Sequence, residues 1–227
     1  MGKARIIIEG IYIVGGPDVS RSDDAASFII NFGGELVMID AGAGGSSRIL
    51  QKNIEDAGLD PGKISTLILT HNHIDHIGSA PYFRTHFGCK IVMHELDADA
   101  VEEGDSMRTA ASCYGTTFSP MTVDRKLKGG EEILRFGGEE LHCLHTPGHT
   151  PGSISIYLDR AGKRILFGQD IHGPFLDIFM SDINHWKKSM EKLIALEADI
   201  LCEGHFGIFQ TKEDVKRYIE RYLKNYR

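Results

Sequence analysis

Cysteine is scarce in this sequence of 227 residues. The four present are Cys89, Cys113, Cys143 and Cys202, and none forms a Cys-x-x-Cys pair. Thiols scattered in this way argue against a disulfide framework, and we expect them to be buried as small apolar side chains. This usage is typical of a reducing compartment, so the cytoplasm is the expected location.

Long apolar runs and an excess of positive charge are also missing. No run approaches the ~20 residues that a bilayer span needs, so no membrane association is expected. Lys and Arg total 25 against 32 Asp and Glu, a net charge of −7, which argues against nucleic-acid binding. The sequence has neither a Gly-Lys-Ser/Thr phosphate loop nor a Gly-x-Ser-x-Gly turn for a nucleophilic serine.

Histidine, in contrast, is concentrated in one place. Three of the 11 histidines and one aspartate lie within the segment His71–His76, directly after a predicted strand. Imidazole is the commonest metal ligand near neutral pH, and aspartate supplies an anionic oxygen. Alternate residues of an extended stretch share a face, so His71 and His73 can point at one ion. Asp75 and His76, at the turn into the next helix, can then address a second ion.

Three further candidates lie where other predicted strands end. His149 occurs in a loop of turn residues between two strands, Asp170 follows the strand Arg164–Phe167, and His205 follows the strand Asp199–Cys202. Each is a His or Asp close to a glycine after an apolar strand. Such loop positions suit an open catalytic site. Together with the histidine-rich segment, these residues are expected to be metal ligands.

The predicted elements form two successive groups of strands, each ending in a helix. This order favours two sheets packed face to face with helices outside, a four-layer αββα sandwich in the α/β class. We find no linker or internal repeat, so residues 1–227 are predicted to be a single domain. One helix is expected over Ile77–Phe87. The less regular stretch from about residue 95 to 128 is predicted to be an insert that forms a substrate wall.

The order of these motifs resembles the metallo-β-lactamase superfamily. The resemblance covers residues from about 27 to 207, with HxHxDH at His71–His76 and TPGHT at Thr146–Thr150. It implies the αββα sandwich with two metal ions at one edge of the sheets. Carried over position by position, it implies that His71, His73 and His149 bind the first ion. It implies that Asp75, His76 and His205 bind the second ion. Asp170 would then bridge both ions, and Asp40 would be an acid beside the cluster. Gly168-Gln169-Asp170 has one residue more than the usual Gly-Asp, which leaves Asp177 as the alternative bridge.

In having an aspartate at the bridging position, the sequence resembles glyoxalase II-like hydrolases, lactonases and RNase Z-like nucleases. We expect two divalent ions, zinc first, with iron or manganese as alternatives, because a carboxylate bridge accommodates all three. The resemblance implies hydrolysis of a thioester, ester or lactone bond by a hydroxide that bridges the ions, since coordination lowers the pKa of water to about 7. Asp75 is then the expected catalytic residue, which orients the hydroxide and moves its proton.

Two other activities stay open. A persulfide-dioxygenase-like oxidoreductase uses the same fold with one iron, and an RNase Z-like phosphodiesterase is opposed by the charge of −7. Glutathione recognition is also open, since glyoxalase II carries a helical domain after its last histidine and only 22 residues (227 − 205) follow His205. The expected partner is a small-molecule substrate, with a homodimer as the expected assembly. Candidate substrate contacts are Met107, Tyr114 and Phe118 in the insert, and His172 and Phe175 after the bridging aspartate.

Overall fold

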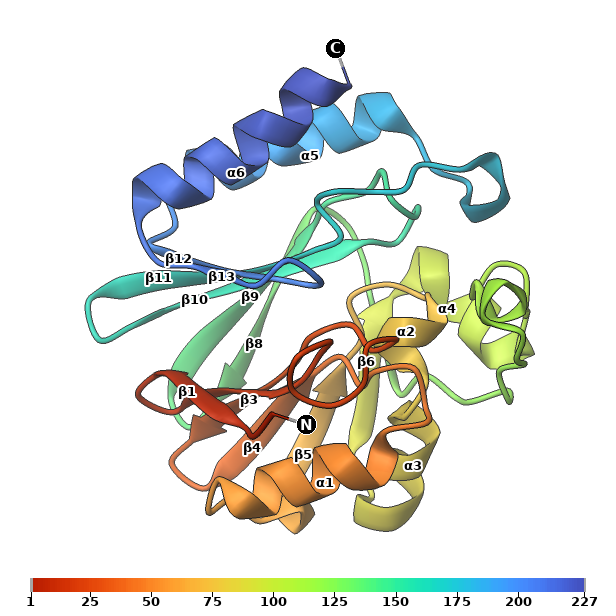
Figure 1. Cartoon of the computed structure of the whole chain (residues 1–227), viewed down its shortest axis with the longest axis vertical. Coiled ribbons are helices and arrows are strands. Elements are labelled where there is room, and N and C mark those ends of the chain that lie inside the picture. The colour runs from red at the N-terminus through yellow and green to blue at the C-terminus, as the bar shows by residue number, and fades with distance from the viewer. Residues whose placement is uncertain (1, 227) are drawn as a thin grey trace.

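Two β-sheets face each other in the computed structural model, which describes residues 2–226 (Figure 1). Within those residues the first sheet has seven strands in chain order: β1 (Arg5–Ile8), β2 (Ile11–Gly15), β3 (Ser27–Phe32), β4 (Glu35–Ile39), β5 (Ile64–Ile68), β6 (Lys90–His94) and β7 (Arg125–Leu127). The second, again within 2–226, has six in the order β13 (Ile208–Phe209), β12 (Ile200–Glu203), β11 (Lys163–Gln169), β10 (Ile154–Arg160), β9 (Glu139–His145) and β8 (Glu131–Phe136). The strands from β4 to β7 run parallel, as do β11 and β12.

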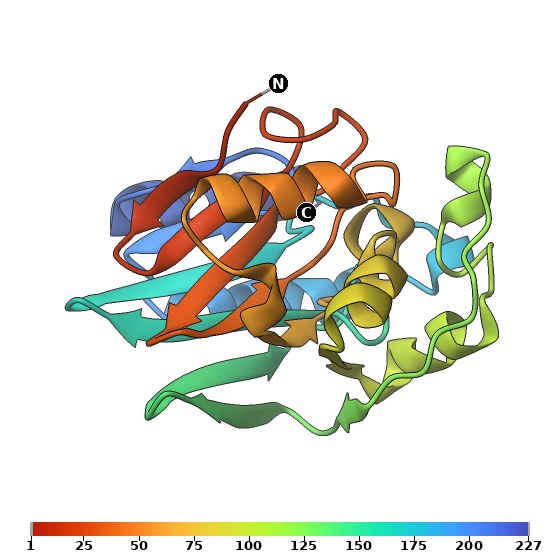
Figure 2. The same ribbon diagram turned by 90° about the horizontal axis from the view of Figure 1, so that it is seen from below.

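Helices lie outside both sheets (Figures 1 and 2). On the side of the first sheet are α1 (Ser47–Asp56), α2 (Ile74–Ile77), α3 (Ala80–Phe87) and α4 (Glu95–Glu103), and on the side of the second are α5 (Ile183–Ala195) and α6 (Lys212–Asn225). The chain also forms short 3-10 helices, namely η1 (Pro61–Lys63), η2 (Ala111–Tyr114) and η3 (Asp177–Phe179). The predicted four-layer αββα sandwich is confirmed.

Three apolar clusters fill the spaces between these four layers. Strand β3 shows how the sequence divides its side chains between them. Phe28 and Ile30 belong to the cluster between the sheets, whereas Ile29 belongs to the cluster beneath the outer helices. This division follows from the two-residue period of a strand. Phe28 meets Phe167 of β11 edge to face, with ring centroids 5.1 Å apart, so the two sheets are in direct contact at this pair.

The helix expected over Ile77–Phe87 is wrong in one respect, because the structure divides it. α2 ends at Ile77, and α3 begins at Ala80 with a proline in its first turn, a position where the missing N–H costs nothing. At Gly78 the chain passes so close to the neighbouring loop that a Cβ atom would lie 2.2 Å from the carbonyl carbon of Ala43. The segment that carries the histidines is thereby held as a separate short helix.

Two other expectations need correction. Cys113 is exposed in η2, whereas the other three cysteines are buried; all four are free. The stretch of residues 95–128 is only partly an insert, because α4 packs on β6 and β7 extends the first sheet. Figure 2 shows residues 104–124, drawn in green, at one side of the sandwich. None of the helices within residues 2–226 combines the length and apolar character needed to cross a bilayer.

The contact between the sheets predicts that Phe167→Ala destabilises the protein by about 3–5 kcal/mol, because it removes a fully buried ring and leaves a cavity. Urea unfolding at matched metal content measures this. Ile6→Ala is the control, since the Ile6 side chain is 67% exposed on the edge strand β1 and should change stability by less than about 0.5 kcal/mol. Equal losses in both variants would contradict the role given to this pair.

Candidate metal centre

Most of the predicted ligands come from loops or turns that follow parallel strands, whereas His149 lies in the loop between the antiparallel strands β9 and β10. In the first sheet Asp40 follows β4, and the histidine-rich segment follows its neighbour β5. In the second sheet Asp170 follows β11, and His205 follows its neighbour β12. The carboxyl ends of parallel neighbours meet at one edge of a sheet, where ligands bind in open α/β folds. A hydrogen bond of 2.9 Å from the Ile154 N–H to the Thr70 carbonyl joins the edges of the two sheets.

The structure brings together the seven residues predicted as ligands, in two groups. The first group is His71, His73, His149 and Asp170, and the second is Asp75, His76 and His205. In each group one potential ligand atom from every residue lies within 4.8 Å of the others. Six of the seven side chains are buried and His205 is half-buried. The alternative bridge, Asp177, lies instead in η3 with an exposed side chain, so the structure favours Asp170 at this position.

Asp170 lies between the two groups. Its Oδ1 atom is 3.2 Å from His76 Nε2 and 3.2 Å from His205 Nε2, which are both members of the second group. Its Oδ2 atom is 3.4 Å from His149 Nε2, in the first group. One oxygen therefore faces each group, which is the arrangement that a carboxylate bridge between two ions requires.

The polar atoms at the centre of the cluster lack partners of their own. Among the described residues, four buried ligand atoms make no hydrogen bond: His71 Nε2, His73 Nε2, His76 Nε2 and Asp170 Oδ1. A buried polar group without a partner costs about 1–3 kcal/mol. Imidazole nitrogen and carboxylate oxygen are the donors that zinc and related divalent ions take in proteins. The residues present therefore fit such ions.

The protonation of the first group favours metal binding. Burial lowers the pKa of His71 and His73 well below the usual value, and it lowers the pKa of His149 to about 4. These three imidazoles are neutral near pH 7, which is the form that coordinates a metal. Burial alone would raise the pKa of Asp170, but the charges and hydrogen bonds of His76 and His205 together outweigh it and hold the pKa well below its usual range. Asp170 is therefore ionised, which is the form that a metal-bridging carboxylate needs.

Asp40 orients His76 from behind. The His76 Nδ1–H donates to Asp40 Oδ2 over 2.8 Å, and the Thr70 N–H donates to Asp40 Oδ1 over 2.9 Å. The second bond fixes the carboxylate at the end of β5. With Nδ1 of His76 engaged, Nε2 is the nitrogen available to an ion, a pattern common around metal-binding histidines. Burial lowers the pKa of His76, but the carboxylates of Asp170 and Asp40 outweigh burial and raise it well above the usual value.

Asp97 is a site residue that sequence reasoning missed. It is fully buried in α4, where its Oδ2 accepts hydrogen bonds from the Asn72 N–H (3.1 Å) and the Thr150 hydroxyl (2.6 Å). Its Oδ1 accepts from the Gly152 N–H over 2.7 Å. Burial raises the pKa of this carboxyl to about 6 in spite of these bonds. One side chain thus joins the loop of His71 and His73 to the loop that carries His149.

The structure places the candidate substrate contacts of the insert in different surroundings. Phe118 is only 5% exposed and belongs to the apolar core beneath the outer helices, so it is not available to a substrate. Met107 and Tyr114 are about half exposed, at 50% and 45%. Burial, followed by the charge of the nearby Asp75 carboxylate, raises the pKa of the Tyr114 hydroxyl. Tyr114 is therefore the insert residue that reaches the centre.

The two candidates after Asp170 also differ from each other. The ring of Phe175 packs on Trp186 of α5, with centroids 5.0 Å apart, and lies 6.4 Å from the ring of His149. It belongs mainly to the apolar cluster between the second sheet and its helices. His172 is half-buried, and its ring centroid lies 5.1 Å from that of His205. Only His172 of this pair lies directly beside the predicted ligands.

Comparison with known sequences matches most of this chain to one protein family. The family model of the metallo-beta-lactamase superfamily matches residues 23–205. The hydroxyacylglutathione hydrolase GloC of Haemophilus influenzae is 34% identical over 181 residues, which cover 77% of this chain and 82% of that protein. A protein of Methanocaldococcus jannaschii named "probable metallo-hydrolase" is 31% identical over 135 residues, which cover 60% of this chain and 63% of that protein.

Comparison with solved structures shows the same fold. An engineered form of a metallo-beta-lactamase from Cronobacter sakazakii superposes with a TM-score of 0.84, 20% sequence identity, and coverage of 100% of this chain and 96% of that one. The metallo-beta-lactamase GOB-18 of Elizabethkingia meningoseptica superposes with a TM-score of 0.78 and 22% identity, covering 99% of this chain and 90% of that one.

The contacts of Asp97 predict that Asp97→Asn weakens metal binding about 10–100-fold. The amide NH2 of asparagine cannot accept a hydrogen bond, so at least one of the three donors that now bond to the carboxylate would lose its acceptor. Competition with a chromophoric chelator measures the dissociation constants. Asp99→Asn is the matched control on the same helix, since the Asp99 side chain is 64% exposed. A folded Asp97→Asn variant with unchanged metal affinity would show that Asp97 does not position the ligand loops.

Proposed function

This chain belongs to the metallo-beta-lactamase superfamily, and from that premise we propose that it is a dinuclear metallo-hydrolase that cleaves a thioester, ester or lactone bond. The family uses divalent metals, typically zinc, and the chain contains the histidines and aspartates to bind them. The observation that carries the proposal is the pair of ligand groups with Asp170 between them. A single ion would need only one of these groups.

Each residue of the site has a defined task in this proposal. The first ion would be held by His71, His73 and His149, the second by Asp75, His76 and His205, and both by Asp170. When bound, such ions lower the pKa of water toward about 7 and polarise an acyl oxygen.

Asp75 is the residue best placed to move a proton. Its Oδ2 atom lies 3.4 Å from His205 Nε2 and 3.7 Å from His76 Nε2, at the centre of the second group. Burial raises the pKa of this carboxyl, which brings it closer to the range in which a group both accepts and releases a proton near neutral pH. The Tyr114 hydroxyl beside it can donate a hydrogen bond to a substrate oxygen.

Two apolar segments adjoin the cluster and support a substrate with an apolar acyl part. The insert is joined to α2 by a hydrogen bond of 2.7 Å from the Ile74 N–H to the Thr109 carbonyl, and it exposes Met107 and Tyr114. The η3 segment is joined to the cluster by Phe179, whose ring centroid lies 4.2 Å from that of His73. Leu176, Ile178 and Met180 are exposed along this segment. Apolar side chains of this kind typically line small-molecule sites.

The relative named hydroxyacylglutathione hydrolase supports a thioester as the first substrate to examine. Purified protein would be analysed for metal content and offered S-lactoylglutathione, a series of lactones and a phosphodiester. Thioester or lactone hydrolysis with two metal equivalents supports the proposal. Oxygen uptake with glutathione persulfide at one iron equivalent would support the dioxygenase alternative instead, and phosphodiester cleavage alone would support the nuclease alternative.

The ligand assignment predicts that Asp75→Ala lowers kcat/KM by about 10²–10⁴, because a proton-transfer group is lost together with a ligand. His71→Ala should remove about one equivalent of bound metal, measured by elemental analysis after dialysis. His86→Ala, an exposed histidine of α3, is the control that should change neither quantity. Full turnover with normal metal content in Asp75→Ala or His71→Ala would exclude the proposed mechanism.

A further inference from the structure

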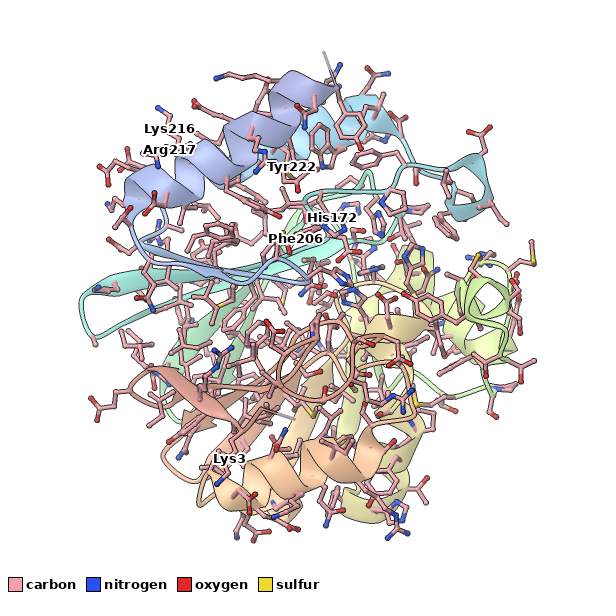
Figure 3. All side chains as sticks on the ribbon, in the orientation of Figure 1. Lys3, His172, Phe206, Lys216, Arg217 and Tyr222 are labelled. Atoms are coloured by element: carbon pink, nitrogen blue, oxygen red, sulfur yellow. The ribbon has the colours of Figure 1, made fainter. Side chains whose placement is uncertain are left out.

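His172 lies next to the proposed ligands, although the sequence motifs give it no role in metal binding. One of its ring nitrogens forms, with Asp170 and His205, a third group whose potential ligand atoms all lie within 4.8 Å of one another. The rings of His172 and His205 are almost perpendicular, at 79°. Figure 3 shows His172 near Phe206 and below Tyr222 of α6.

A buried carboxylate fixes the orientation of this imidazole. The side chain of Glu203, at the end of β12, is fully buried, and its Oε1 accepts a hydrogen bond from His172 Nδ1–H over 3.0 Å. Its Oε2 accepts from the N–H groups of His205 (2.7 Å) and Phe206 (2.8 Å). Glu203 therefore holds His172 and the loop of His205 in one network. With Nδ1 engaged, Nε2 is the nitrogen of His172 left for a ligand.

This network repeats the contact that Asp40 makes with His76. In both cases a buried carboxylate takes the Nδ1–H of a histidine beside Asp170. Carboxylates in this position raise the basicity of the opposite nitrogen and fix the tautomer that binds a metal. Asp40 follows a strand of the first sheet, whereas Glu203 ends a strand of the second.

The backbone after Asp170 brings His172 back to the cluster. The Gly173 N–H donates to the Asp170 carbonyl over 3.3 Å, which closes a tight turn that contains His172. Gly173 has a φ of +92°, a conformation that other residues rarely adopt. The rings of His172 and Phe206 pack edge to face, with centroids 4.7 Å apart. The imidazole is thus held from three directions, which lowers the entropy lost when it binds an ion.

We propose that Asp170, His172 and His205 form an additional position for a divalent transition ion. Two imidazoles and a carboxylate, with further positions open to water, suit zinc, cobalt or iron better than magnesium or calcium. The position shares Asp170 and His205 with the second ion of the proposed hydrolase, and the inference rests on that proposed function to this extent. The second ion then has two overlapping positions, one toward His76 and one toward His172.

Titration of the metal-free protein with Co²⁺ tests this, because cobalt–imidazole coordination is visible by absorption. The variant is His172→Phe, which keeps a ring against Phe206 and removes both nitrogens. The first equivalent of Co²⁺ should bind as in the wild type. The second should bind more than twofold more weakly and with an altered absorption band, because the position toward His172 no longer contributes to its affinity. His172→Asn is the second variant, in case a phenyl ring beside the Glu203 carboxylate disturbs folding.

His142→Phe is a closely matched control. His142 also donates its Nδ1–H to a glutamate, over 2.8 Å to Glu131, and its side chain is 20% exposed against 18% for His172. Its ring stacks on Tyr157, with centroids 4.4 Å apart, in the second sheet. The control should bind both equivalents as the wild type does.

The outcomes separate this inference from the function on which it rests. If both His172 variants bind the second equivalent within twofold of the wild type and with the same spectrum, His172 is not a ligand, and the inference alone is overturned. If the wild-type protein binds no second equivalent of Co²⁺, the dinuclear function and the additional position both fall. A selective loss at the second equivalent in His172→Phe and His172→Asn, but not in His142→Phe, supports the proposal.

Discussion

Five imidazoles and two carboxylates face one another where the edges of the two sheets meet. The two carboxylates need positive charge beside them, and the other features of the site depend on this constraint. A carboxylate taken out of water costs several kcal/mol unless a cation or hydrogen bonds compensate. In the protein alone, a proton on His76 between Asp40 and Asp170 supplies part of that charge. Metal ions would supply it more fully, since they would also bind the buried nitrogens that have no hydrogen-bond partner among the described residues.

Behind the ligands lies a second set of buried acids, Asp40, Asp97 and Glu203, which are each at most 1% exposed. Each accepts a hydrogen bond from a backbone N–H of a ligand-bearing loop, at Thr70 for Asp40, Asn72 for Asp97 and His205 for Glu203. These bonds hold loops that would otherwise be the mobile parts of the fold. The precision of the metal centre therefore comes from carboxylates that need not touch an ion.

The sequence predicted most of the layers and the histidine-rich segment, because both depend on local patterns, whereas the resemblance to a known family supplied the grouping with the distant ligands. A run of apolar residues, Phe28, Ile29 and Ile30, marks β3, and the spacing from His71 to His76 places its own side chains together. Contacts between distant segments were not predictable in this way. Asp97 is 53 residues from Thr150 and resembles any acid on an amphipathic helix. The break at Gly78 depends on a loop more than 30 residues earlier, and the burial of Phe118 depends on how the insert folds back onto the outer core.

The chain positions of the ligands have a consequence for synthesis. The first half of the chain provides His71, His73, Asp75 and His76, and the second half provides His149, Asp170 and His205. A nascent chain folds from its N-terminus as it leaves the ribosome, so the first sheet can form while its histidines still lack the rest of the ligand set. Neither group of ligands is complete until the second sheet has been made and docked. Acquisition of metal would then be among the last steps of maturation, and it would report that both sheets are in place.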